Sequence, residues 1–465
     1  MANIRDQCSW VHMTEKELAT KKAKKLIQMA VANVRLNRPL VEKPVPVVPR
    51  GLVIGGGLAG MTAALQLANQ GFEVFLVEKE EKLGGNLWNL RYTIDGREIK
   101  TFLEDTIAQV AANPLIHVLI NSLVVDFGGV KGNFTSGVLT APAMYYRKIE
   151  HGVTIVATGA EEEKPQEYFY GKDPRVLTQL QLEKLVSEQE ERVVRAREIV
   201  MIQCVGSRNE TRPSCSRICC STAVKNALKL KELNPSVNIT ILYRDVRTYG
   251  LMEQYYLKAR EQGIIFVRYE PENPPTVALS EGHLTVSFKE RSIGEEIIKH
   301  PDFLVLSSAI VPRENKDLAN LLKVPRTAEG FFLEAHMKLR PVDFASDGIY
   351  MAGAAHAPKL IPETIAQAYA AAARAATILA KKNLYAGGIV AVVDGSKCAA
   401  CLTCVRVCPY EVPVINNQGE AEIDGLKCKG CGTCVAECPA RAIDLMHFGH
   451  QQLRNKVSAL SMGKE

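Results

Sequence analysis

The strongest constraint on the fold of this chain is a short apolar run that ends in spaced glycines. Residues 50–54 are followed by Gly55, Gly57 and Gly60, which make the G-x-G-x-x-G spacing of a dinucleotide-binding turn. The first glycine permits a tight strand-to-helix turn, the second lets a pyrophosphate approach the backbone, and the third lets the helix pack closely on the strand. The pattern predicts a β-strand, a phosphate-binding turn and a helix that begins near Leu58.

The next segment strengthens the prediction of a dinucleotide-binding domain. Residues 72–77 form a second apolar strand, and Glu78 stands at its end, 23 residues after Gly55. A carboxylate at this place accepts a hydrogen bond from a ribose 2′-hydroxyl and repels a 2′-phosphate. Gly84 and Gly85 then make a second glycine turn, which we expect to pass under the cofactor.

Two later segments favour FAD over NAD as the ligand of this domain. Residues 152–159 form a strand that ends in Ala-Thr-Gly, and residues 347–353 form another that ends in glycine. The arrangement resembles the flavoproteins with two dinucleotide-binding domains, the class of thioredoxin and glutathione reductases, over about residues 50–385. In that family both strands return to the FAD. A further strand, residues 121–126 with Val124, should flank the adenine. The other residues expected to bind FAD lie in these turns and strands and in the segment that follows the last one: Gly55, Gly57, Leu58, Ala59, Gly60, Glu78, Lys79, Gly84, Gly85, Asn86, Ala157, Thr158, Gly159, Gly353, Ala354, Glu363 and Thr364.

The composition indicates a globular protein of two or three domains. The 465 residues are 47% hydrophobic and 23% charged, and the net charge is +6. No Lys/Arg stripe with interleaved aromatic residues is found, so we do not expect nucleic acid as a partner. The first residues lack the apolar core of a signal peptide, and no apolar run is long enough to span a membrane, so a cytoplasmic protein is expected. Thirteen cysteines in such a chain indicate metal sites rather than disulfides.

A duplicated cysteine motif marks a ferredoxin domain near the C-terminus. Residues 397–409 and 427–439 each contain C-x2-C-x2-C-x3-C-P, with 8 of 13 positions identical. This is the motif of bacterial two-cluster ferredoxins, in which the fourth cysteine of each run ligates the other cluster. Zinc sites instead favour ligands in two pairs. The spacing predicts one [4Fe–4S] cluster on Cys398, Cys401, Cys404 and Cys438, and a second on Cys428, Cys431, Cys434 and Cys408.

A third set of cysteines replaces the phosphate loop of the expected second nucleotide domain. Residues 198–203 form a buried strand, residues 222–233 a helix and residues 238–243 another strand, which is a βαβ frame. Between the first strand and the helix, where a nicotinamide-binding domain has its glycines, the chain carries Cys204, Cys215, Cys219 and Cys220. We interpret them as ligands of a [4Fe–4S] cluster close to the flavin. A reactive or disulfide-forming set is the alternative.

The middle cysteines, residues 243–250 and residues 3–12 together resemble the A subunit of heterodisulfide reductase, an FAD and iron–sulfur protein of anaerobes, over essentially the whole chain. The resemblance implies that the four middle cysteines hold a [4Fe–4S] cluster. It also implies a thioredoxin-reductase-like α/β flavoprotein with a C-terminal α+β ferredoxin domain. Family members often carry an N-terminal cluster domain and a ferredoxin insert. This chain starts near the end of the former, and residues 86–150 lack cysteine, so a short form is expected.

The chain should therefore hold one FAD and three [4Fe–4S] clusters and act as an electron-transfer subunit of a larger redox complex. The resemblance implies partners like the B and C subunits of heterodisulfide reductase, a hydrogenase or formate dehydrogenase module, or ferredoxin. It also implies a homodimer within the complex and flavin-based electron bifurcation. Two alternatives are an NAD(P)H-dependent reductase similar to the small subunit of glutamate synthase, and a cluster-bearing assembly scaffold.

Three smaller predictions concern single segments. Thr14 and Glu17 fit a capping box that opens a helix to about residue 36. His356 and Lys359 are candidate catalytic residues at the isoalloxazine, with solvated loop residues as the alternative; the helix after them, with Pro362 in its first turn, would direct its positive end at the flavin. Cys8 is either a buried free thiol or a cluster ligand.

The expected domains follow from these motifs. Residues 1–48 form an N-terminal helical arm with a Pro-rich linker, and residues 49–160 and 312–385 form the two halves of a FAD domain. A cluster-bearing domain, residues 161–311, is inserted between these halves. A ferredoxin domain over residues 386–448 and a polar tail over residues 449–465 follow.

Overall fold

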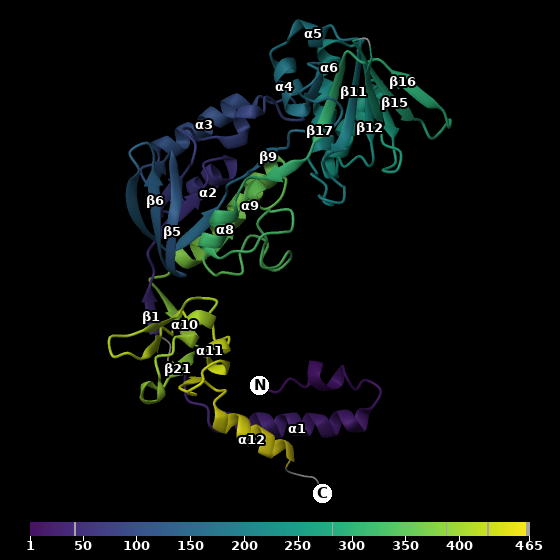
Figure 1. The fold of residues 1–465 in the computed structure, drawn as a ribbon. Helices are drawn as coiled ribbons and strands as arrows, with labels where there is room; N and C mark the ends of the chain where they lie inside the picture. The colour runs from purple at the N-terminus through teal and green to yellow at the C-terminus, as the bar shows by residue number, and fades with distance from the viewer. Residues whose placement is uncertain (41–42, 281, 387, 426, 462–465) are drawn as a thin grey trace. The chain divides into compact units, whose positions relative to one another are not determined.

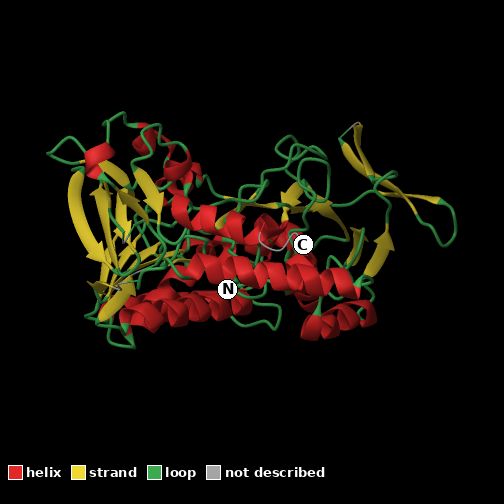
Figure 2. Ribbon diagram, turned by 90° about the horizontal axis from the view of Figure 1, so that it is seen from below, coloured by secondary structure: helices red, strands yellow, loops and turns green. Residues whose placement is uncertain are grey.

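The computed structural model describes residues 1–40, 43–280, 282–386, 388–425 and 427–461. They form two compact units: Val47–Lys382 is the larger, and Met1–Pro46 together with Asn383–Glu465 make the smaller. Both units mix helices and strands (Figures 1 and 2), so the predicted α/β class is confirmed.

The first sheet of the larger unit has five parallel strands. Their order is β19 (Ile349–Met351), β8 (Val153–Val156), β2 (Arg50–Ile54), β3 (Glu73–Val77) and β4 (Ile116–Leu119). Strand β8 is buried along its whole length, as a strand covered on both faces should be. The helices of this half are α2 (Leu58–Ala68), α3 (Ile99–Ala112), α8 (Lys316–Leu322) and α9 (Ile361–Leu379).

Helix α2 begins and ends where its glycines dictate. Gly57 precedes it in extended conformation, and Gly71 lies beyond its end with a φ of 88°. A methyl group at Gly60 would lie 1.8 Å from the carbonyl oxygen of Gly55. Only glycine therefore lets α2 approach β2 this closely, as the motif predicts.

A three-stranded antiparallel sheet follows the first βαβ units. It consists of β5 (Ser122–Val130), β6 (Asn133–Thr140) and β7 (Tyr145–His151). Helix α8 packs against β5. The large buried side chains of this half, among them Leu52, Phe332 and Phe344, form one core between the sheets.

The second parallel sheet carries the middle cysteines. Its strands, in order, are β10 (Val176–Thr178), β17 (Phe303–Ser308), β11 (Glu198–Val205), β12 (Asn238–Tyr243) and β13 (Ile265–Arg268). Its helices are α4 (Gln179–Ser187), α5 (Glu191–Val194), α6 (Cys219–Leu233) and α7 (Glu253–Glu261). A small antiparallel sheet, β14 (Thr276–Ser280), β15 (His283–Lys289) and β16 (Glu296–Lys299), packs on it.

Two short antiparallel strands connect the halves of the larger unit. They are β9 (Ala160–Glu162) and β18 (Ile310–Pro312). The chain leaves the first sheet through β9 and returns through β18, which brings the ends of both parallel sheets to a common region.

The smaller unit joins both ends of the chain. Its strands pair as β1 (Lys43–Pro46) with β20 (Asn383–Ala386), β21 (Ala391–Val393) with β24 (Ile443–Leu445), and β22 (Pro413–Ile415) with β23 (Ala421–Ile423). Its helices are α1 (Lys16–Val34), α10 (Thr403–Val407), α11 (Thr433–Ala436) and α12 (His450–Ser461).

One local prediction for this unit is wrong, and another segment gains a defined structure. The predicted N-terminal helix exists as α1, but Glu15 precedes it and no side chain caps its first turn, so the capping box of Thr14 and Glu17 does not form. The predicted polar tail forms helix α12 over most of its described part, and α12 packs against α1.

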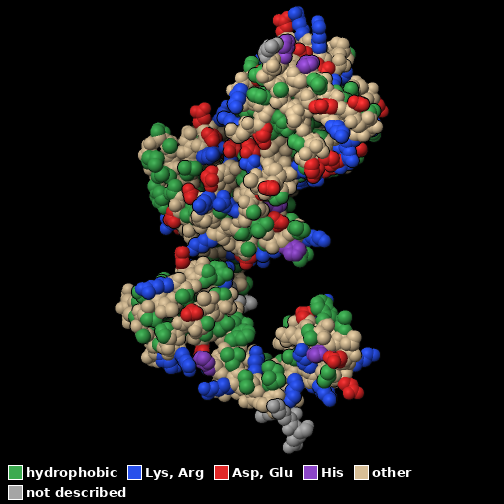
Figure 3. All heavy atoms as spheres, turned by 45° about the vertical axis from the view of Figure 1, so that its right-hand side comes forward, with side chains coloured by type: hydrophobic (Ala, Val, Ile, Leu, Met, Phe, Trp, Pro, Cys, Tyr) green, Lys and Arg blue, Asp and Glu red, His purple; other side chains and the backbone are tan. Residues whose placement is uncertain are grey.

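Two surface observations complete the fold. No helix among the described residues is long and apolar enough to cross a membrane. On the face of the molecule shown in Figure 3, basic and acidic side chains are interspersed over the larger unit.

Candidate functional site

A cavity of about 1010 Å³ lies in the larger unit, at the ends of the strands of both parallel sheets. This is the size range of cofactor sites. Most of the residues predicted to bind FAD line it: Gly55, Gly57, Leu58, Ala59, Glu78, Lys79, Gly84, Gly85, Asn86, Val124, Ala157, Thr158, Gly159, Ala354 and Thr364. Lys359 also lines the cavity.

Four predicted site residues do not line the cavity. Gly60 is the packing glycine of α2. Gly353 has a φ of 74°, and a methyl group on it would lie 2.6 Å from the Ala59 Cβ. His356 contacts Lys359 rather than the cavity, and Glu363 accepts hydrogen bonds at the start of α9.

The glycine turn and Glu78 are joined by hydrogen bonds. The buried Glu78 carboxylate accepts from the Gly56 N–H at 2.6 Å and from the Glu80 N–H at 2.9 Å. Gly84 donates its N–H to the Gly56 carbonyl at 2.9 Å, which brings the second glycine turn against the first. The acid predicted for a ribose is therefore fixed at the mouth of the phosphate turn.

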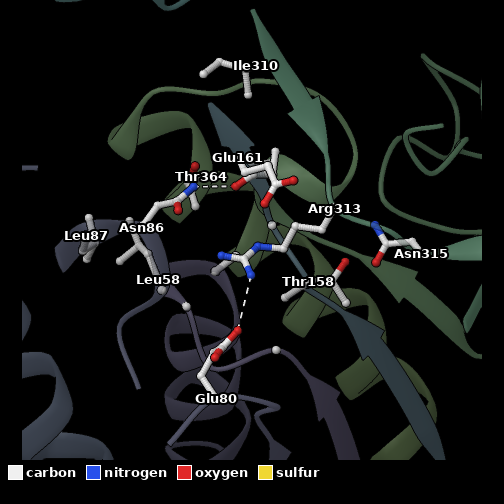
Figure 4. Close-up of a pocket in the computed structure, with 18 of the residues that line it drawn as sticks. Leu58, Glu80, Asn86, Leu87, Thr158, Glu161, Ile310, Arg313, Asn315 and Thr364 are labelled. Carbon is white, nitrogen blue, oxygen red and sulfur yellow. Dashed lines mark hydrogen bonds and ion pairs between the residues drawn. The ribbon is translucent and has the colours of Figure 1, made fainter. Parts of the chain in front are cut away.

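Three buried polar atoms in the cavity wall have no partner in the protein. They are Thr158 Oγ1, Ser308 Oγ and Asn315 Nδ2. Buried polar groups are nearly always hydrogen-bonded, so these atoms fit a polar ligand such as a dinucleotide. Thr158 and Asn315 appear together in Figure 4, beside Arg313 and its ion pair with Glu80 at 3.7 Å.

Sequence reasoning missed Ser308, Arg313 and Asn315. They lie at or after the end of the buried strand β17, at the carboxyl end where α/β sheets bind ligands. Polar residues at the end of a buried strand were the available signal.

The four middle thiols lie together at one end of the second sheet. Cys204 has a φ of 64° and sits at a register shift in β11, and such bulges redirect side chains. Helix α6 starts at Cys219, three residues earlier than predicted, so Cys219 and Cys220 occupy its first turn. Burial and the neighbouring thiol of Cys220 raise the pKa of Cys204, and Cys215 adds to this effect. Cys219 also lines the cavity, so the thiol set borders it.

Positive and polar groups surround these thiols. A hydrogen bond with Cys219 lowers the pKa of Cys220, and Arg247 lowers it further. Arg208 hydrogen-bonds Cys204 and pairs with Asp245 at 2.8 Å. Buried nitrogen atoms nearby lack partners: Gln203 Nε2, Arg208 Nη1 and Arg244 Nε. Cationic neighbours, unpaired donors and a helix N-terminus suit a thiolate-bound cluster, whose sulfurs accept hydrogen bonds.

The ferredoxin cysteines gather in the smaller unit. A small pocket in the smaller unit is lined by the thiol residues of the first set, Cys398, Cys401, Cys404 and Cys438. In the second set, burial and then Cys428, Cys408 and Cys431 raise the pKa of Cys434 to about 11. Thiols crowded in this way become stable thiolates when bound iron compensates their charge.

Backbone donors also point at these sulfurs. N–H groups of Ala421, Gly430 and Ala442 lie 3.3, 3.4 and 3.3 Å from the Sγ atoms of Cys398, Cys428 and Cys438. Among the described residues, no group of three or more His, Cys, Asp or Glu side chains is placed to hold a metal ion. The crowded thiols, with backbone donors facing three of their sulfurs, are compatible with thiolate-bound clusters, whose sulfurs accept hydrogen bonds.

Cys8 is buried, with 1% of its surface exposed, and its thiol donates to the Ala19 carbonyl at 2.8 Å. This contact stabilises the turn before α1. The geometry favours the free-thiol interpretation.

Comparison with known proteins identifies two segments directly. Residues 53–105 match the family model of an NAD(P)-binding Rossmann-like domain, and residues 391–439 match that of a 4Fe-4S dicluster domain. Lactococcus lactis thioredoxin reductase in its FR conformation has a TM-score of 0.49 at 19% identity, over 71% of this chain and 99% of that one.

Relatives that match over most of the chain decide the family. The second iron–sulfur A subunit of the CoB--CoM heterodisulfide reductase of Methanopyrus kandleri is 36% identical, over 88% of this chain and 76% of that protein. The chain belongs to the family of heterodisulfide reductase A subunits. Another member, the A subunit of the H(2):CoB-CoM heterodisulfide,ferredoxin reductase of Methanothermobacter thermautotrophicus, is 33% identical over 98% of this chain and 83% of its own length. Membership in the family of heterodisulfide reductase A subunits makes the chain an iron–sulfur oxidoreductase component, and the predicted resemblance is confirmed.

Proposed function

We propose that the chain is an electron-transfer subunit that passes electrons between a FAD in the large cavity and three [4Fe–4S] clusters. One observation carries this proposal: Cys219 belongs both to the cavity wall and to the four-thiol set. A cofactor that fills the cavity would therefore lie next to a cluster held by Cys204, Cys215, Cys219 and Cys220.

The chain's own residues would hold the flavin in a defined way. The glycine turn and the N-terminus of α2 would receive the pyrophosphate, and Glu78 would accept from the ribose. Thr158, Ser308 and Asn315 would provide polar contacts, as their unpaired atoms allow. FAD supplies the exchange between two-electron and one-electron chemistry, and the clusters carry single electrons.

The second and third clusters would lie in the smaller unit. The first would be held by Cys398, Cys401, Cys404 and Cys438, and the other by Cys428, Cys431, Cys434 and Cys408. The exposed Cys401 and Cys431 place both sets near the surface, where a redox partner reaches them. The proposed domains are those of the sequence analysis, with the N-terminal arm and the tail packed together beside the ferredoxin domain.

Relatives suggest the partners. The names of four relatives include ferredoxin, and that of the Methanosarcina acetivorans protein also includes F(420)H(2). We propose that this chain likewise works beside B- and C-like subunits, ferredoxin, or a hydrogenase or formate dehydrogenase module. Flavin-based electron bifurcation would be the chemistry of such a complex.

The rival function is an NAD(P)H-dependent reductase. Against it, the first loop of the second sheet carries cysteines in place of glycines, and Glu163 and Arg212 form an ion pair across its start. The scaffold alternative has no specific contact in its favour among the described residues.

The test is an anaerobic reduction of the purified chain by different donors. A reduced one-electron dye or reduced ferredoxin should bleach both the flavin and the cluster absorption, and cluster signals should appear in electron paramagnetic resonance spectra. NADH and NADPH should bleach neither. Rapid bleaching of the flavin by a nicotinamide would contradict the proposal and support the rival.

A further inference from the structure

A chain of hydrogen bonds behind the cavity fixes the protonation of one histidine. The Gly353 N–H, which can only donate, points at Gln367 Oε1 at 2.9 Å. Gln367 Nε2 must therefore donate to His356 Nδ1, 2.9 Å away. Because Nδ1 is then the acceptor, the ring proton is on Nε2, where it donates to Glu334 at 2.9 Å. His356 is thus a neutral ring whose Nδ1 lone pair points toward Gln367.

Lys359 also contacts this Nδ1 acceptor. Its Nζ lies 3.1 Å from His356 Nδ1 and 3.3 Å from the Ala357 carbonyl, and Lys359 lines the cavity while His356 does not. Burial, and then the charge of Lys359, lowers the pKa of His356. A proton on His356 Nδ1 would be a third donor facing the donor groups of Gln367 and Lys359. The ring therefore acts as a fixed acceptor and does not carry a proton.

Neighbouring groups act on the charge of Lys359 in opposite directions. Burial, and then Arg217 from the cysteine loop, lowers its pKa to about 8, while Glu363 on α9 and Glu334 act in the opposite direction. Arg217 is itself paired with Glu363 at 2.7 Å, and the Tyr249 hydroxyl donates to the same carboxylate at 2.8 Å. Near this pH, a new negative charge in the cavity would favour the ammonium form.

We propose that Lys359 binds one proton from solvent when the flavin in this cavity is reduced, and that His356 positions its amine for that role. The inference rests on the proposed flavin site. An external reductant would supply two electrons to the flavin, which would take up one proton, and a second proton from solvent would convert the Lys359 amine to ammonium. Lys359 would therefore be a catalytic residue, and His356 a positioning residue.

The test is the flavin midpoint potential measured against pH, from pH 6 to 10, by anaerobic redox titration at the flavin absorption band. Below about pH 8 one proton should accompany each electron pair, and above it two. The additional proton changes the equilibrium constant tenfold per pH unit, which is about 30 mV for a two-electron couple.

Three variants make the result specific. Lys359→Met should remove the steeper segment and keep one proton per electron pair throughout. Glu334→Gln removes a negative charge that faces Lys359, so the steeper segment should begin at a lower pH. Lys316→Met, a change at an exposed lysine on α8 outside the cavity wall, should leave the wild-type profile unchanged.

The two proposals fail differently. A flavin-loaded wild type with no change of slope, or a Lys359→Met variant that keeps the change, overturns the role of Lys359 while the flavin site stands. A chain purified anaerobically without flavin, and unable to take it up, overturns both.

Discussion

Gly353→Ala tests how closely the strand end after β19 approaches α2. The substitution has two costs, because Gly353 has a φ of 74° and because the new methyl group would lie 2.6 Å from the Ala59 Cβ. The left-handed conformation costs an alanine about 1–2 kcal/mol. Overpacking adds about 1–3 kcal/mol, so the total should be about 2–5 kcal/mol.

Gly71→Ala is the matched control. Gly71 has a similar φ of 88°, but nothing lies within 4 Å of the added methyl group, so only the conformational cost of about 1–2 kcal/mol applies. The assay is the urea midpoint of flavin release, followed by flavin fluorescence under anaerobic conditions. Gly353→Ala should lower the midpoint more than Gly71→Ala.

A second variant separates the two costs. Ala59→Gly in the Gly353→Ala background removes the contact but not the left-handed strain, so it should recover part of the loss. Equal midpoints for Gly353→Ala and Gly71→Ala, with no recovery in the double variant, would refute the close approach of Gly353 to Ala59.

Three further predictions concern buried polar groups. Lys225→Met should destabilise the larger unit by about 3–5 kcal/mol, because it leaves the buried Glu183 carboxylate without the ammonium group 2.8 Å away. Adding Glu183→Gln, which removes the charge but keeps an acceptor for the Arg91 N–H, should recover most of this loss in urea unfolding followed by circular dichroism. Burial raises the pKa of Glu162, in the cavity wall, to about 7. The folded state therefore binds more protons than the unfolded state, and stability should fall as pH rises from about 4.5 to about 7. Thermal unfolding of Glu162→Gln, followed over the same pH range, should lack this decline. Cys8→Ala should lose about 1 kcal/mol with its hydrogen bond to Ala19 but keep the wild-type iron content, and a loss of about four iron atoms would instead make Cys8 a ligand.

The sequence predicts well where a local motif dictates the geometry. The spacing of Gly55, Gly57 and Gly60 places the turn, the start of α2 and its close packing, because each glycine answers a steric demand within a few residues. The duplicated cysteine motif likewise predicts which thiols gather in the small pocket, including the exchange of Cys438 into the first set.

Prediction fails where distant segments meet. Ser308 and Asn315 reach the cavity from about 150 residues beyond Thr158, and no local pattern links them. The tautomer of His356 depends on Gln367, and no sequence pattern encodes that contact. At the chain ends, packing of α12 on α1 forms a helix from residues that carry no strong start signal.

The most direct test of the central claim is an anaerobic count of iron, sulfide and flavin, on the wild type and on a Cys219→Ser, Cys220→Ser double variant. The account predicts about 12 iron atoms and one FAD in the wild type, and about four fewer iron atoms with the FAD retained in the variant. About eight iron atoms in both proteins would contradict it. The middle cysteines would then be thiols, and no cluster would stand beside the flavin.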